Sequence, residues 1–321
     1  DPAFAFRHGL IREAAYAMLT ESDRELGHRL AAGWLEQSGE HDPLVLADHF
    51  QRGAENQRAV RHFIRAAQAA YDGGNYPAIL PICDRAVACG AQGEERGEIM
   101  LSIARKYAVS YEMKKVSTPA EEALRLLPEG SVPWFSAVAL LSLAGAYTGN
   151  LASLLMALEA FQGYQGPIPA SGPAGIAGHV LCGGLVHGGQ REAADQLLER
   201  MEAAERDAER MDPVFSGYLC LMRTFCSLME LSDLGEALPN AERALHLFAE
   251  ARDELAQSLA YYLKGWAQIA VGDFENGEQT CQHGLQHSRR LGFGWAEGTT
   301  TVFLGLAQIM RGQERTGIET L

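Results

Sequence analysis

The chain has 321 residues, 47% of them hydrophobic, so it can bury a large core and is not an intrinsically disordered sequence. Its formal net charge of -14 argues against binding to nucleic-acid backbones or anionic membranes, because both require clustered Lys and Arg. Beyond residue 71 there are 31 acidic and 19 basic residues, so a partner attracted there by charge is expected to be basic or neutral. Helix-forming residues dominate while Val and Ile are sparse, which predicts an all-α protein.

Cysteine usage and the chain start indicate a cytoplasmic protein. The six cysteines form no CxxC pair, and a chain of this size needs no disulfides, so free thiols are predicted. The opening letters "DPAFAF" lack the charged and apolar regions of a signal peptide. The uncharged run 137–158 approaches the length of a membrane span, but Gly149 and Asn150 divide it into two amphipathic halves. We therefore expect no membrane segment.

The N-terminal region predicts three helices. The first is indicated by apolar residues on one helix face, namely Leu10, Ile11, Ala14, Ala15 and Met18. Ser22 and Glu25 have the spacing of a capping box for the second helix, which should end at Ser38. Asp42, followed by Pro, should begin the third helix, and Gly53 should end it.

A turn motif then recurs along the chain. A Gly or small residue, a polar residue and a helical run follow one another at 73–76, 148–151, 188–191, 231–234, 271–274 and 311–314. The step is about 40 residues or slightly less, which indicates stacked supersecondary units. The Gly can end one helix in the left-handed conformation, and the Asn or Asp after it can cap the next. Each unit is therefore predicted to be two antiparallel helices.

Small residues at fixed places in these units resemble the tetratricopeptide repeat. Gly265, Gly277 and Gly284 occupy its three small-residue positions in one unit, and Gly305 with Gly317 begins another. The unit at 97–130 has "KKVSTP" where its second helix should begin, and the 135–162 unit keeps little besides the turn. The resemblance covers residues 58–321 and implies a right-handed superhelix of about seven antiparallel helix pairs, the last one truncated. Spacings near 40 are similar to those in the solenoids of large bacterial ATP-dependent regulators.

Residues 6–36 and 46–67 resemble the junction between a nucleotide-binding region, with its winged-helix-like tail, and the helical repeats of bacterial signalling ATPases, and the junction is predicted to occupy residues 1–57. Such proteins are fused to serine/threonine kinases or cyclases, or act as transcription activators. The residues that carry this resemblance are Phe6, Arg7, His8, Ile11, Glu13, Ala15, Tyr16, His28, Ala47, His49, Phe50, Ala66 and Ala67. The resemblance implies adjacent ATPase or kinase domains in a parent chain. An ordinary amphipathic helix would predict the same local structure.

Motifs for catalysis or cofactor binding are not evident. The sequence contains no GxxxxGK[ST] phosphate loop, no kinase loops and no HExxH, so we expect no enzyme activity and no cofactor. His283 and His287 are four residues apart with Cys281 nearby, but without an evident third ligand we interpret them as surface residues and predict no metal site. The Gly- and Pro-rich segment 163–175 could be a surface loop, a joint between two lobes or a flap over a groove.

The remaining functional signal is the inner wall of the predicted superhelix. The concave positions of tetratricopeptide repeats map to an unusually apolar set, with Val302, Ile309 and Met310 in the last unit. Either this wall binds an apolar ligand or peptide, or these side chains pack between repeats. The candidate partner-binding residues are Tyr147, His179, His187, Met222, Met229, Tyr262 and Trp266.

The expected function is a non-catalytic scaffold that binds a protein segment or small effector and signals to an adjacent ATPase or kinase domain. The alternative is the ligand-binding sensor domain of an ATP-dependent transcription activator. A self-contained enzyme would need convergent polar groups, for which His179, His187 and Glu230 are the candidates. Nucleic-acid recognition by the N-terminal segment has little support.

Overall fold

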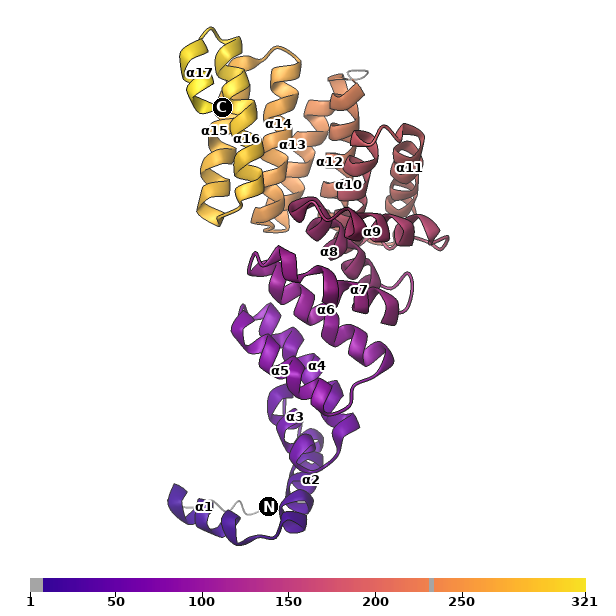
Figure 1. The fold of residues 1–321 in the computed structure, drawn as a ribbon, viewed down its shortest axis with the longest axis vertical. Helices are drawn as coiled ribbons and strands as arrows, with labels where there is room; N and C mark the ends of the chain where they lie inside the picture. The colour runs from indigo at the N-terminus through magenta and orange to yellow at the C-terminus, as the bar shows by residue number, and fades with distance from the viewer. Residues whose placement is uncertain (1–7, 231–233) are drawn as a thin grey trace. The chain divides into compact units, whose positions relative to one another are not determined.

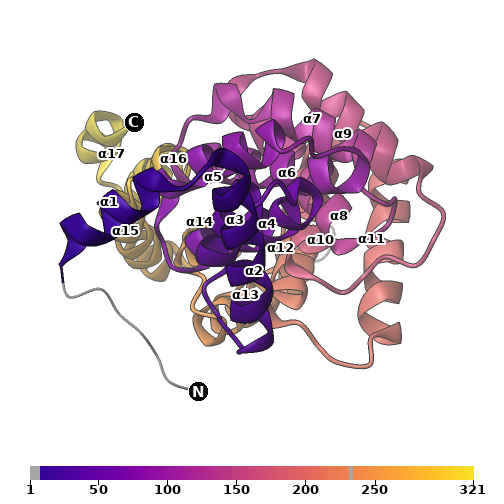
Figure 2. The same ribbon diagram turned by 90° about the horizontal axis from the view of Figure 1, so that it is seen from below.

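The computed structural model describes residues 8–230 and 234–321. These residues contain only helices and their connections, with no strand, as both views of the chain show (Figures 1 and 2). The predicted all-α class is therefore confirmed. The chain divides into two compact units, Asp1–Pro128 and Glu129–Leu321. This division lies inside the region predicted for the repeats, and the predicted boundary at residue 57 stays a prediction.

Unit 1 begins with a helix that buries none of its residues, α1 (Gly9–Met18). The helices that follow are α2 (Glu21–Gln37), α3 (Pro43–Arg52), α4 (Asn56–Asp72), α5 (Tyr76–Ala88), α6 (Gly93–Val109) and α7 (Ser117–Leu126), with a 3₁₀ turn η1 (Met113–Lys115) before α7. From α2 onward each helix packs against the next one, and α4 also contacts α6. The "KKVSTP" segment thus delays the second helix of its pair until Ser117.

Caps in unit 1 agree with the sequence at α3 and correct it at α2. The Asp42 carboxylate accepts a hydrogen bond from Leu44 N at 2.8 Å, and Gly53 ends α3 as predicted. The N-cap of α2 is Thr20, whose hydroxyl oxygen accepts from Asp23 N at 3.2 Å. The predicted box at Ser22 and Glu25 is therefore wrong, because Ser22 already lies inside the helix.

Replacing Thr20 by alanine should lower the unfolding free energy of unit 1 by about 1 kcal/mol, because an orphan backbone N–H loses its acceptor. The matched change Ser22→Ala should leave stability unchanged within about 0.5 kcal/mol, because Ser22 is exposed on the helix. Urea denaturation followed by circular dichroism measures both variants. Equal losses would show that Thr20 is not the operative cap.

Unit 2 consists of five helix pairs in the described residues. They are α8 (Val132–Thr148) with α9 (Leu151–Gly163), α10 (Gly172–His187) with α11 (Arg191–Asp207), α12 (Pro213–Glu230) with α13 (Leu234–Glu250), α14 (Glu254–Ala270) with α15 (Phe274–Leu291), and α16 (Gly294–Met310) with α17 (Glu314–Thr320). The helices of each pair pack together, and the first helices also contact one another in succession, α8 on α10, α10 on α12, α12 on α14 and α14 on α16. Figure 1 shows α12 to α17 standing side by side.

The recurring turns form as their sequence predicts. The central glycines of five of them have φ between 69° and 86°, the left-handed region that disfavours a Cβ: Gly74, Gly149, Gly189, Gly272 and Gly312. Asn150 and Asp273 cap the helices that follow, whereas Asn75 makes no side-chain cap. Most of the turn at 231–234 lies outside the described residues.

Small residues allow paired helices to approach closely. A Cβ on Gly277 would lie 3.4 Å from Gly265 O and 2.8 Å from Ile269 Cγ1, so glycine at these small-residue positions lets α14 and α15 approach closely. A Cβ on Gly305 would lie 3.0 Å from Gly317 O. In the α8 and α9 pair, where the pattern is lost, Gly145 has this role, since its Cβ would lie only 2.9 Å from Leu154 N.

The Gly- and Pro-rich segment between α9 and α10 lies within unit 2 and does not join the two units. Arg200 of α11 donates hydrogen bonds to the backbone oxygens of Tyr164 at 2.5 Å and Phe161 at 3.4 Å. Ile168 is buried there. The segment is therefore a surface loop that packs against α11. No helix in the described ranges is both long and apolar enough to cross a membrane.

Candidate functional site

A chain of aromatic contacts links the first helices of unit 2. We call it the aromatic row. Tyr147 of α8 stacks on Phe293 at 6.1 Å between ring centroids and lies 6.3 Å from Trp295. From Trp295 the contacts continue to Tyr262 (5.6 Å), Phe303 (6.1 Å), Trp266 (4.9 Å), Phe225 (6.1 Å) and His187 (5.3 Å). The row therefore spans α8, α16, α14, α12 and α10.

Four of the seven predicted site residues, Tyr147, His187, Tyr262 and Trp266, belong to this row. His179 lies outside it and contacts Tyr218, with 5.8 Å between the ring centroids. The two methionines do not share one environment, because Met222 is fully buried whereas Met229 is exposed. The structure thus brings the aromatic members of the predicted set together and separates the rest.

Burial decides which of these residues a partner could reach. Met222 has an exposed fraction of 0% and Tyr262 of 5%, so both pack between helices. Burial also lowers the pKa of His179 to about 4, and its Nδ1 has no hydrogen-bond partner. At neutral pH His179 is therefore uncharged. His187 is exposed, and its Nδ1 lies 2.8 Å from Gly183 O.

The aromatic row opens to solvent on α16. Residues 295, 302, 306 and 310 repeat at intervals of seven and four, which places them on one helix face. Their exposed fractions are 40% for Trp295, 53% for Val302, 38% for Leu306 and 51% for Met310. We call these four residues the α16 stripe. Trp295 connects the stripe to the row through its contacts with Tyr147 and Tyr262.

Sequence reasoning named Val302 and Met310 but missed the other members of the stripe. Leu306 occupies a concave position of the repeat pattern, four residues after Val302, so the pattern itself could have found it. Trp295 and Phe293 lie at the start of α16, before the positions that the pattern maps. Their contact with Tyr147 depends on how five helix pairs stack. The spacing of residues within one repeat does not predict this stacking.

Unit 2 as a whole carries a net negative charge. Residues 129–321 contain 23 Asp and Glu and 12 Lys and Arg, a net charge of -11. The aromatic row itself contains no Asp, Glu, Lys or Arg. An apolar surface on an acidic unit attracts basic partners during diffusional encounter.

Other candidate sites in unit 2 are less developed. His287 Nε2 lies 3.0 Å from Glu254 O, and Cys281 is buried, so the predicted surface histidines do not converge with a thiol. In the described part of the chain no three or more His, Cys, Asp or Glu residues gather as a metal site would require. A cavity of about 370 Å³ between residues 166–170 and α11 is lined mainly by alanine and loop backbone.

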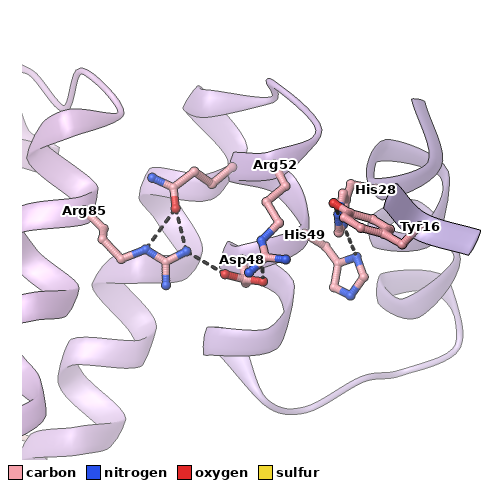
Figure 3. A network of polar contacts seen from close by, with 7 residues as sticks. Tyr16, His28, Asp48, His49, Arg52 and Arg85 are labelled. Atoms are coloured by element: carbon pink, nitrogen blue, oxygen red, sulfur yellow. Dashed lines mark hydrogen bonds and ion pairs between the residues drawn. The ribbon is translucent and has the colours of Figure 1, made fainter. Parts of the chain in front are cut away.

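Unit 1 contains a polar cluster that joins its first helices (Figure 3). The Tyr16 hydroxyl of α1 lies 2.9 Å from His28 Nε2 of α2, and His28 Nδ1 lies 3.1 Å from His49 Nδ1 of α3. One Nδ1 must donate its proton and the other must accept it, so the two Nδ1 atoms cannot both carry a proton while the contact persists. Partial burial and the neighbouring His49 and Arg52 lower the pKa of His28.

A second part of the same cluster links α3 to α5. Arg85 Nη2 donates to Asp48 Oδ1 at 2.7 Å, and Arg52 Nε lies 3.1 Å from Asp48 Oδ2. Residues of α1, α2, α3 and α5 thus form two neighbouring groups of polar contacts that both include residues of α3 (Figure 3). Tyr16, His28 and His49, which carry part of the resemblance to an ATPase junction, are direct neighbours in it.

Comparison with known proteins adds no assignment. No protein-family model matches this sequence, and no curated protein matches it.

Proposed function

We propose that the chain is a non-catalytic interaction module in which helix pairs of tetratricopeptide type stack into a right-handed superhelix. Three observations support this architecture: helix pairs joined by tight glycine turns, close approach of paired helices at glycines, and contacts between successive first helices. Helix pairs of this kind cannot bury their apolar faces alone and therefore stack on their neighbours. Stacked pairs of this kind present extended binding surfaces.

The observation that carries the proposed function is the exposed end of the aromatic row. The α16 stripe exposes four apolar side chains on one helix face, and exposed apolar patches mark interaction sites. Trp is enriched among the residues that dominate interface energy, and Met adapts to differently shaped partners. The net charge of unit 2 favours a partner segment with apolar anchors and basic flanks.

The proposed setting is a regulatory segment of a larger signalling ATPase or kinase. Unit 1 supports this through the polar cluster, which fastens α1 to the following helices by Tyr16, His28 and His49. Arg24 adds hydrogen bonds to the backbone oxygens of Tyr16 at 3.1 Å and Ala17 at 3.0 Å. A segment attached in this way can transmit movement of a preceding domain to the repeats. In the alternative function, a sensor domain would bind a small effector at the α16 stripe.

The test screens an array of basic peptides with Trp, Phe or Leu anchors against the purified chain and measures the best binder by calorimetry. We expect Trp295→Ala and Leu306→Ala each to weaken binding at least about tenfold, as for an interface anchor. The matched variants Trp34→Ala and Leu155→Ala also remove exposed apolar side chains, but in unit 1 and on α9, and should leave affinity unchanged. Equal losses in all four variants would contradict the proposal. Binding of a small effector but no peptide would favour the sensor alternative.

A further inference from the structure

Two buried thiols in unit 2 face each other across two different helices. Cys182 Sγ of α10 and Cys226 Sγ of α12 are 3.6 Å apart and form a weak hydrogen bond. Both residues are free and buried. A disulfide needs a sulfur separation near 2.05 Å, so the two sulfurs must approach by about 1.5 Å.

The helices around this pair permit that approach. The backbones of α10 and α12 are already close at Gly175, where a Cβ would lie 3.1 Å from Phe215 Cα. Next to Cys182, Gly183 and Gly184 leave space, since a Cβ on either would meet no atom nearer than 3.8 Å. The sulfurs are already 3.6 Å apart, so rotation of the two cysteine side chains with a small shift of α10 and α12 would bring them to bonding distance.

We propose that Cys182 and Cys226 are an oxidation site that forms a reversible disulfide when the chain meets hydrogen peroxide. This modification is independent of the proposed partner site. It would link α10 covalently to α12 directly beside Phe225, which contacts His187 in the aromatic row.

The reaction consumes one peroxide and two thiols. The Cys226 sulfur attacks one peroxide oxygen, the O–O bond breaks, and the departing hydroxide leaves as water with the Cys226 proton, which produces a sulfenic acid. The Cys182 sulfur then attacks the sulfenic sulfur, the S–O bond breaks, and a second water leaves with the Cys182 proton. The two sulfurs are oxidised together by two electrons, and the peroxide is reduced to two waters.

The order of attack follows from the contact between the two thiols. Either sulfur can donate in this hydrogen bond, and when Cys182 donates, the bond lowers the pKa of Cys226 because it stabilises the Cys226 thiolate. Burial raises the pKa of Cys83 and of Cys281 to about 12 and also raises that of Cys220. These other thiols are consequently poorer nucleophiles than Cys226.

The test oxidises the folded chain with hydrogen peroxide, blocks remaining thiols with N-ethylmaleimide in guanidinium, and maps the cysteines by mass spectrometry. We expect two of the six thiols to become unavailable, with one cross-linked peptide pair containing Cys182 and Cys226 that dithiothreitol separates. Cys226→Ser should abolish the cross-link, whereas Cys220→Ser on the same helix should retain it. Mapping of the unaltered chain decides the question if a variant does not fold.

Three outcomes would overturn the inference. They are alkylation of all six thiols, overoxidation of single cysteines without a cross-link, and a cross-link that joins two chains or other cysteines. Non-reducing electrophoresis distinguishes a link within one chain from a link between two.

Discussion

Replacing Gly145 by valine is expected to lower the unfolding free energy of unit 2 by about 3 kcal/mol, the upper end of the range for overpacked cores. A Cβ at this position would lie 2.9 Å from Leu154 N and 3.1 Å from Asn150 O. Both are backbone atoms, which cannot rotate away as a side chain could. Helices α8 and α9 would therefore have to separate along part of their interface.

The matched control for this change is Gly298→Val on α16. A Cβ on Gly298 would meet nothing within 4 Å, and the residue is exposed. Valine is a slightly better helix former than glycine, so the unfolding free energy should rise by about 0.3 kcal/mol. Chemical denaturation of both variants gives the comparison. A Gly145→Val variant as stable as the control would mean that α8 and α9 do not pack at the described distance.

Acidification should destabilise unit 2 through His179. Its pKa is about 4 in the folded chain because burial disfavours the charged imidazole, compared with 6.5 for an unperturbed histidine. Above pH 6.5 both states are neutral at this position and the residue has no effect. As the pH falls from 6.5 towards 4, the unfolded chain binds a proton that the folded chain does not, so the unfolding free energy decreases by up to about 3 kcal/mol.

The variant His179→Phe isolates this contribution, because phenylalanine keeps a ring against Tyr218 but cannot be protonated. The difference between the unfolding free energies of the wild type and the variant should change by up to about 3 kcal/mol between pH 7 and pH 4, in the direction that favours the variant in acid. Other titrating groups cancel in this difference. Parallel pH profiles for the two proteins would show that His179 is already protonated or solvated in the folded chain.

Local chemistry made much of the fold predictable. A glycine that adopts positive φ, or an Asp before a proline, determines the nearby backbone through short-range sterics and hydrogen bonds, so the turn at Gly272 and the start of α3 at Asp42 followed from the sequence. The pairing of Gly265 with Gly277 was predictable for the same reason, because a close approach leaves no room for a Cβ.

Features that depend on stacking were not predictable in this way. Thr20 and Ser22 are both plausible caps in the sequence, and the point at which the backbone becomes helical, at Glu21, makes Thr20 the cap. Similarly, Gly145 lies outside the expected position for close approach, since α8 and α9 contact each other nearer the turn. The contact of Tyr147 with Phe293 depends on the accumulated rotation of successive helix pairs. Small changes in the angle between successive helix pairs add up over five pairs. The spacing of residues in the sequence indicates only the packing within one pair.

Only part of the proposed partner site was predictable, because the burial of a residue depends on the neighbouring helices. The repeat pattern identifies which residues point towards one face, but it does not say which of them a neighbouring helix covers. For Tyr262 the sequence left both partner binding and packing between repeats open, and the structure buries this residue against Phe303 and Trp295. The proposed anchors are instead the exposed residues of the α16 stripe.

The central claim is that the α16 stripe contacts a partner segment. Photo-crosslinking tests it most directly, with p-benzoylphenylalanine in place of Trp295 in one chain and in place of Trp34 in a control chain, each illuminated with the best basic peptide from the array. We predict that the peptide becomes attached at position 295 and not at position 34. Attachment only at position 34, or equal attachment at both positions, would contradict it.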